Sequence, residues 1–175
     1  TPATYVLSDP RYANGHGERL FVNLLGTAAE YRPERLPDEF FRADITTFGG
    51  TALVPPLHAA LPRLLARARA TGALTVVNTV YDFAAELTAP GERWRLGSDE
   101  AYPLVDLLVT DLEEARRLSA PPAAGRDERG PEALLRWFLA RGVGAVVITN
   151  GPRPIRFASR GGRFERSGIA SLPAF

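Results

Sequence analysis

Leu104–Leu118 has the sequence Leu-Val-Asp-Leu-Leu-Val-Thr-Asp-Leu-Glu-Glu-Ala-Arg-Arg-Leu. It begins as an apolar run that only Asp106 interrupts, and then it turns acidic and continues with apolar residues at helical spacing. A short apolar run next to a helical pattern is typical of a strand buried on both faces of a parallel sheet. The acidic residues therefore fall where a strand ends and a helix begins, which is the edge where open parallel sheets bind their ligands.

The same acidic residues also fit a purely structural role. Thr110-x-x-Glu113 and Asp111-x-x-Glu114 each have the spacing of a helix capping box, in which side-chain oxygens accept hydrogen bonds from the free amides of the first turn. Carboxylates at this position also complement the helix dipole. This segment alone is compatible with a capping role and with a ligand-binding role.

Segments on both sides alternate between strand and helix patterns. Two β-rich segments near the start predict a hairpin around a turn at Asn14–Gly17, and a loop is expected at Pro121–Gly130. The predicted helices are a short one from Pro37, Pro55–Ala70 with a kink at Pro62 or a start near Leu61, and Pro131–Arg141. The predicted strands are Thr4–Ser8, Leu20–Leu25, Ala43–Phe48, Ala73–Val77, Val143–Thr149, Ile155–Ser159 and Arg163–Ser167, and the stretch from Asn78 to Pro103 is expected to be irregular. This order predicts an α/β layered domain with about four parallel strands.

Composition excludes several kinds of chemistry. The chain has 175 residues, 45% of them hydrophobic, with a formal net charge of +1, so neither nucleic acid nor a membrane is expected as a partner. It contains no Cys, and every basic residue is Arg, which excludes thiolate catalysis, a Walker-type phosphate loop and Schiff-base chemistry. No signal-peptide pattern opens the chain, and a cytoplasmic location is expected. Met is absent, so Thr1 is not expected to be the natural start.

Polar residues follow three of the predicted parallel strands. These residues are Asn78, then Asp111 with Glu114, then Thr149 with Gly151. Carboxylates bind Mg²⁺, often through its waters, and a Thr hydroxyl and Gly amides donate to phosphate oxygens. The pattern favours a crevice for a metal–nucleotide. Gly49-Gly50 ends another strand and allows close approach of a ligand, although a plain strand-to-helix turn explains it equally well.

The order of these motifs resembles that of the ribokinase-like (PfkB) carbohydrate kinases. In that family a strand ends in Asn-x-x-Glu, and Asp111-Leu112-Glu113-Glu114 is similar, with Asp111 in place of Asn. The replacement keeps an oxygen acceptor, adds a charge and loses an amide donor. The family's next strand ends in Thr-x-Gly, which resembles Thr149-Asn150-Gly151. Further similar segments are Val76-Val77-Asn78 and Gly49-Gly50. Tyr5–Leu7, Gly17-Glu18-Arg19 and Gly26-Thr27-Ala28 resemble the family's lid strands and the glycine stretch after them.

The resemblance implies a three-layer, mostly parallel sheet with helices on both faces and a small β lid. Residues 1–31 would form the lid-like segment and residues 32–175 a partial core. The family's Gly-x-Gly-Asp motif, with its catalytic Asp, is expected after Phe175, and its glycine-rich sugar-binding stretch before Thr1. No catalytic residue is therefore assigned within this chain.

By the same resemblance, the activity is transfer of the ATP γ-phosphoryl group to a sugar hydroxyl with Mg²⁺. Asp111, Glu114, Thr149 and Gly151 would bind the nucleotide, and Glu114 would also hold the metal. Gly49, Gly50 and Asn78 would border the small sugar substrate.

Two alternatives stay open at this point. One is a nucleoside or hydroxymethylpyrimidine kinase of the same superfamily, of which the lid-like hairpin favours the nucleoside kinase. The other is a non-catalytic protein that binds a nucleotide or sugar. An exposed lid sheet also predicts a homodimer formed through Thr4–Leu25.

Overall fold

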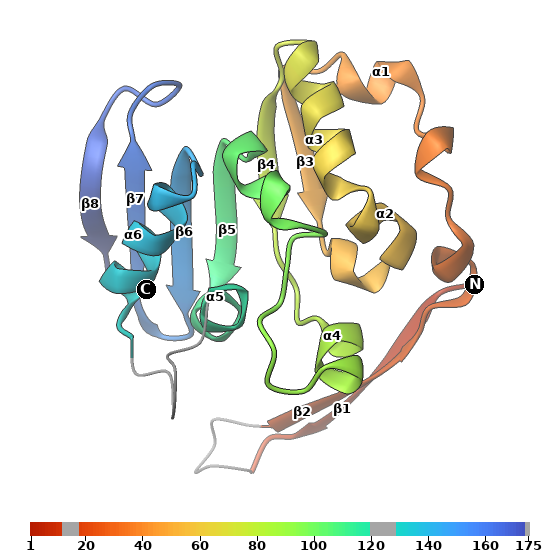
Figure 1. Cartoon of the computed structure of the whole chain (residues 1–175). Helices are drawn as coiled ribbons and strands as arrows, with labels where there is room; N and C mark the ends of the chain where they lie inside the picture. The colour runs from red at the N-terminus through yellow and green to blue at the C-terminus, as the bar shows by residue number, and fades with distance from the viewer. Residues whose placement is uncertain (12–17, 120–128, 174–175) are drawn as a thin grey trace.

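The computed structural model describes residues 1–11, 18–119 and 129–173, and it contains two β-sheets (Figure 1). The larger is a six-stranded sheet whose spatial order follows the chain, β3 to β8. Strands β3 to β6 run parallel, and β7 and β8 are antiparallel additions at one side. The bounds are β3 Ile45–Gly49, β4 Leu74–Asn78, β5 Leu107–Asp111, β6 Ala145–Asn150, β7 Arg153–Arg160 and β8 Ser167–Leu172. The predicted α/β class with a mostly parallel sheet is confirmed.

The smaller sheet is the predicted hairpin. Its strands are β1 Ala3–Asp9 and β2 Glu18–Leu24, which pair antiparallel. In Figure 1 this hairpin extends past α4 at the lower side of the molecule. The turn expected at Asn14–Gly17 and most of the loop expected at Pro121–Gly130 lie outside the described residues.

Helices connect the parallel strands and cover the sheet. Their bounds are α1 Asp38–Phe41, α2 Pro55–Ala59, α3 Leu61–Ala70, α4 Phe83–Thr88, α5 Leu112–Leu118 and α6 Pro131–Ala140, with 3₁₀ turns at Gly26–Glu30, Pro33–Arg35, Thr51–Leu53 and Asp99–Leu104. The predicted Pro55–Ala70 helix divides at Ala60, and Pro62 lies in the first turn of α3, where its missing N–H costs no hydrogen bond. No helix in the described part of the chain is long and apolar enough to cross a bilayer.

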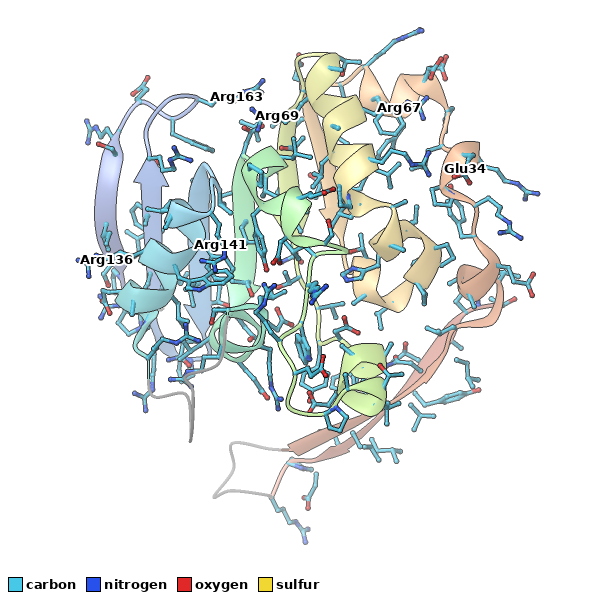
Figure 2. The ribbon with its side chains drawn as sticks, in the orientation of Figure 1. Glu34, Arg67, Arg69, Arg136, Arg141 and Arg163 are labelled. Carbon is cyan, nitrogen blue, oxygen red and sulfur yellow. The ribbon has the colours of Figure 1, made fainter. Side chains whose placement is uncertain are left out.

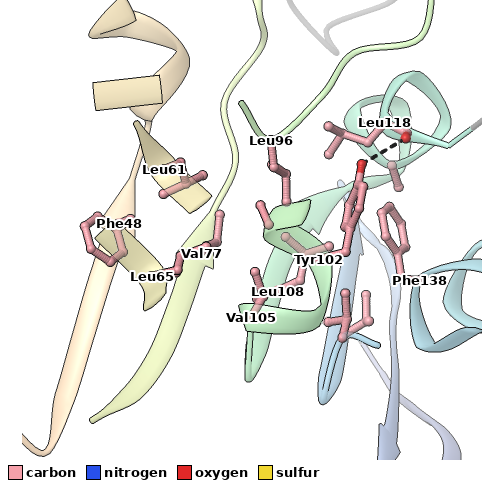
Figure 3. Close-up of a cluster of buried hydrophobic side chains, with 14 of the residues drawn as sticks. Phe48, Leu61, Leu65, Val77, Leu96, Tyr102, Val105, Leu108, Leu118 and Phe138 are labelled. Carbon is pink, nitrogen blue, oxygen red and sulfur yellow. Dashed lines mark hydrogen bonds between the residues drawn. The ribbon is translucent and has the colours of Figure 1, made fainter. Parts of the chain in front are cut away.

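The core lies between the sheet and α3, α5 and α6. Alternate strand residues on this side are buried, among them Phe48, Val77 and Leu108, whereas their neighbours on the other side are half-buried or, like Ile45, exposed. Figure 3 shows apolar side chains from α3, β4 and β5 packed in this layer, with the buried Tyr102 hydroxyl donating to Leu118 O at 3.2 Å. Burial raises the pKa of Tyr102 well above its usual range.

Asp106 is a buried carboxylate at the amino-terminal side of the sheet. It directly precedes β5, and its Oδ2 accepts a 2.9 Å hydrogen bond from the backbone N–H of Thr75 in β4. Arg69 and Arg163 reach its two oxygens at 3.3 and 3.6 Å. Its backbone carbonyl accepts a 2.7 Å hydrogen bond from Ala145 in β6. One residue therefore joins three neighbouring strands where they begin.

Gly144 permits the close approach of β6 to β5 at the same place. Its N–H donates to Val105 O at 3.0 Å. A Cβ added to Gly144 would lie 2.7 Å from the carbonyl oxygen of Asp106, which is closer than real Cβ contacts.

Three local expectations were wrong. The apolar run Leu104–Val109 does not form the strand from its start, because Leu104 ends a 3₁₀ turn and β5 begins at Leu107. The last strand is β8, Ser167–Leu172, and not Arg163–Ser167. The stretch expected to be irregular contains α4, whose first turn is capped by Asp82 Oδ1, which accepts from Ala85 N at 2.9 Å.

We expect Asp106→Ala to lower the free energy of unfolding by about 3 kcal/mol, because it removes the buried acceptor of the Thr75 amide and leaves two arginines without their carboxylate. Asp99→Ala is the matched control, because Asp99 pairs with Arg93 while 59% exposed, and surface pairs are worth under about 1 kcal/mol. Urea unfolding of both variants measures the difference. Equal losses would contradict the role given to Asp106.

Candidate functional site at the carboxyl edge of the sheet

The four parallel strands end at Gly49, Asn78, Asp111 and Asn150, and these ends form what we call the carboxyl edge. The register places Gly49 beside Asn78, and Asp111 beside Thr149. The structure therefore brings to this one edge all the residues singled out in the sequence: Gly49, Gly50, Asn78, Asp111, Glu114, Thr149 and Gly151. Their functional roles stay predictions.

Asp111 is the N-cap of α5. Its Oδ1 accepts a 2.7 Å hydrogen bond from the Glu114 amide, and Glu114 Oε2 accepts from the Asp111 amide at 3.4 Å. The Asp111-x-x-Glu114 capping box is therefore present. Capping occupies only one carboxylate oxygen of each residue, so it does not exclude a second role for either.

Glu114 connects the end of β4 to the start of α5. Its side chain is buried, with 8% exposed, and the Thr79 hydroxyl at the end of β4 donates to its Oε2. The Thr110 hydroxyl lies 3.5 Å from the same oxygen. Its Oε1 accepts no hydrogen bond from the residues that the structure describes. One oxygen of Glu114 is thus held by protein groups, and the other is left for a ligand or water.

Burial is the main reason why the pKa of Glu114 is raised. The neighbouring Asp111 charge raises this pKa further, while the hydrogen bonds from Thr79, the Asp111 amide and Thr110 lower it. Burial therefore makes the charged form of Glu114 more costly in solvation, and a bound cation would offset that cost.

Thr149 and Gly151 lie where β6 turns into β7. Thr149 is half-buried beside Asp111, and the pairing of β6 with β7 is irregular between Ile148 and Asn150. Gly151 has φ +53°, a left-handed conformation, and nothing lies within 4 Å of a Cβ placed there. The edge is therefore open at Gly151, where backbone could approach a phosphate group.

Gly50 closes the turn after β3. It has φ +60°, and its N–H donates to the Asn78 carbonyl at 3.0 Å. The exposed Asn78 side chain donates to Val109 O at 3.3 Å. The left-handed conformation and hydrogen bond of Gly50 are those expected of a strand-to-helix turn. The neighbouring Gly49 is exposed and leaves open space at the edge.

Thr79 is the one described partner of Glu114 at the carboxyl edge that lies outside both the capping box and β5, and the sequence did not single it out. Thr79 follows Asn78 directly, so the presence of a second polar residue after the strand was the sequence feature that could have indicated it.

Thr79 also lines a small cavity of about 20 Å³ with Thr51, His58 and Asp82, which has room for about one water molecule. His58 Nδ1 lies 3.0 Å from Thr51 Oγ1, and its Nε2 lies 2.8 Å from Arg95 O.

The donor set fits Mg²⁺ held through water. Within residues 1–11, 18–119 and 129–173, no group of three or more His, Asp or Glu side chains is placed to hold a metal ion directly. Mg²⁺ retains several waters and needs only one or two carboxylates when a phosphate supplies other oxygens. Glu114 Oε1 and the second oxygen of Asp111 are available for such contacts.

The raised pKa of Glu114 predicts a pH effect on stability. This pKa is higher in the folded protein than in the unfolded chain. The contribution of Glu114 to the free energy of unfolding therefore rises as the pH falls through the folded-state pKa. Glu114→Gln lacks this titration. We expect the free energy of unfolding of the wild type, relative to Glu114→Gln, to increase as the pH is lowered from neutral toward the ordinary Glu pKa of about 4.3.

Urea unfolding across that pH range is the measurement. Glu113→Gln removes an exposed carboxylate from the same turn and serves as the control. A wild-type stability that falls relative to Glu114→Gln as the pH is lowered would contradict the assignment.

Comparison with known proteins identifies the family. Residues 11–172 match the pfkB family carbohydrate kinase sequences. No curated protein matches the chain. Among solved structures, the fructokinase from Xylella fastidiosa is similar with a TM-score of 0.68 and 20% identity, over 100% of this chain and 50% of that one. The ribokinase from Thermotoga maritima gives 0.64 and 17%, over 100% and 48%.

A fructokinase from Xylella fastidiosa with bound ATP is also similar, with a TM-score of 0.62 and 16% identity over 97% of this chain and 48% of that one. At these identities the structures show a shared fold, and the chain spans about half the length of the proteins that it matches. Because the family match extends over most of the sequence, the chain belongs to the pfkB family of carbohydrate kinases.

Proposed function

We propose that the complete protein transfers the γ-phosphoryl group of ATP to a sugar hydroxyl, with Mg²⁺, and that residues 1–175 supply its lid and the edge that borders the nucleotide. Family membership supports a kinase in general. The observation that carries the finer proposal is Glu114, whose Oε2 is held by Thr79 and the α5 cap while its Oε1 accepts nothing from the described residues.

Each residue of the edge has a role in this proposal. Bound Mg²⁺ would supply positive charge that neutralises the charge on the phosphoryl oxygens. Glu114 would hold waters of the metal, and the Thr149 hydroxyl and Gly151 amide would donate to phosphate oxygens. Gly49, Gly50 and Asn78 would border the sugar. The catalytic Asp that the family resemblance implies is not assigned to any residue of this chain.

Glu114→Gln tests the proposal in the complete protein. Loss of the charge weakens the hold on the metal's waters, so we expect the Mg²⁺ concentration for half-maximal ADP formation to rise about tenfold, from one lost charge-assisted hydrogen bond. Glu113→Gln is the matched control, with an exposed carboxylate in the same turn of α5. An unchanged Mg²⁺ titration would contradict the role of Glu114.

The assay is run over sugars and nucleosides. Phosphorylation of a sugar supports the proposal, and phosphorylation of nucleosides alone would make the protein a nucleoside kinase. Binding of ATP without transfer to any acceptor would support a nucleotide-binding protein without catalysis.

We further propose that residues 1–31 act as a lid segment on a core of residues 32–175, in a cytoplasmic protein, and that the lid forms a homodimer. One face of the lid sheet, which we call the outer lid face, is apolar and exposed: Tyr5 61%, Leu7 60%, Leu20 59%, Val22 44% and Leu24 52%. Phe21 and Asn23 on its other face line a groove against Leu53, Phe83 and Leu87 of the core.

A second copy of the chain is the partner that this geometry favours. The outer lid face lies away from the core groove, and exposed patches of this kind mark interfaces. The lid strands also have unpaired edges, which a second lid could pair. The same face on two copies would be covered in one symmetric contact.

We expect Leu7→Asp to weaken self-association about tenfold or more, because it places a charge in the apolar interface. Ser8→Asp is the matched control, since Ser8 is the next residue of β1 and faces the other side of the lid. Sedimentation equilibrium measures both. A wild-type protein that stays monomeric at micromolar concentration would contradict the homodimer.

A further inference from the structure

A second polar pocket lies at the opposite edge of the sheet, where the parallel strands begin. It has a volume of about 380 Å³ and is formed by the end of α3, the residues before β5 and β6, and the β7–β8 turn. Its charged lining consists of Arg69, Asp106, Arg160 and Arg163. We call it the arginine pocket.

The arginines outnumber the acidic groups of this pocket. Asp106 is the only carboxylate among the described residues that line it, and Arg69 and Arg163 both reach it. Figure 2 shows Arg69 and Arg163 next to each other at this edge, on the side away from α5 and the lid. One carboxylate neutralises one of the three guanidinium groups, so the pocket keeps a surplus of positive charge.

The guanidinium groups also keep free hydrogen-bond donors. Arg69 uses one nitrogen, Nη1, for Pro103 O and Asp106, and Arg163 uses its Nη1 for Gly72 O and Ala73 O. A guanidinium has five N–H donors, so several on each side chain remain. The exposed Arg160 side chain has no hydrogen bond or ion pair to any described residue.

Charge pairing with Asp106 accounts for the presence of Arg69 and Arg163 in the pocket, but it does not account for Arg160. Arg160 joins the pocket from the end of β7, and its backbone N–H donates to Gly144 O at 2.9 Å, which fixes its main chain beside the pocket. Gly161 and Gly162 follow it and place no side chains in the space. The space is therefore lined by two hydrogen-bonded arginine side chains, Arg69 and Arg163, and by Arg160, whose main chain is held while its guanidinium stays unpaired with the described residues.

We propose that the arginine pocket binds a phosphate-bearing small molecule, a phosphomonoester, at a site separate from the carboxyl edge. A surplus of guanidinium groups with free N–H donors matches a phosphate dianion, which accepts paired hydrogen bonds from arginine. The pocket volume lies in the range of small-molecule sites, so the ester has room for an organic group. Phosphate binding in the arginine pocket does not depend on kinase activity.

Isothermal titration calorimetry of the complete protein with inorganic phosphate tests the site. We expect binding that Arg160→Ala weakens about tenfold or more, because a charge-assisted hydrogen bond is lost without disturbing Asp106. Arg136→Ala is the matched control, because Arg136 is exposed on α6 and lies far from the pocket (Figure 2). We expect it to bind phosphate as the wild type does.

Two further measurements test where the phosphate binds and which ligand the pocket prefers. Thr149→Val tests whether phosphate binds at the carboxyl edge, and loss of binding in this variant but not in Arg160→Ala would overturn the proposal. Absence of phosphate binding, or equal binding by Arg160→Ala and the wild type, would overturn it as well. A hexose monophosphate that binds at least as tightly as inorganic phosphate, with the same dependence on Arg160, supports a phosphomonoester. Tighter binding of inorganic phosphate than of the hexose monophosphate would overturn the assignment of a phosphomonoester as the ligand.

Discussion

The buried carboxylate of Glu114 is the constraint on which the carboxyl edge depends. A charged group with 8% exposure must have polar partners, and it finds them on two strand ends and on the first turn of its own helix. Thr79 directly follows β4, Thr110 lies in β5, and the Asp111 amide lies at the start of α5. Satisfying this one carboxylate therefore aligns the ends of neighbouring strands and sets where α5 begins.

Sequence reasoning worked where the interactions are local. The two capping residues Asp111 and Glu114 are only three positions apart, and the division of Pro55–Ala70 near Pro62 follows from the proline itself, so both could be predicted. The strand ends also lie at one edge, because parallel strands of a single sheet share their direction. The start of β5 was predicted too early, since the apolar character of Leu104 does not distinguish a strand from a packed 3₁₀ turn.

Long-range partners could not be predicted in the same way. Thr79 and Glu114 are 35 residues apart, and Thr75 and Asp106 are 31 apart, so no spacing rule connects them. Asp106 looked like an interruption of an apolar strand, yet it joins three strands. The last strand was predicted too early in the chain, because the residues of β8 lack a clear alternation of polar and apolar side chains. Its position is set by pairing with β7.

Gly144 has an evolutionary consequence. Its missing side chain allows the β5–β6 hydrogen bonds at Val105 and Asp106 to form, and any larger residue would push these strands apart where the buried carboxylate is anchored. Sequence drift at this position is therefore blocked by main-chain geometry rather than by chemistry at any binding site. Homologues that share this strand spacing should retain glycine there even where their substrates have diverged.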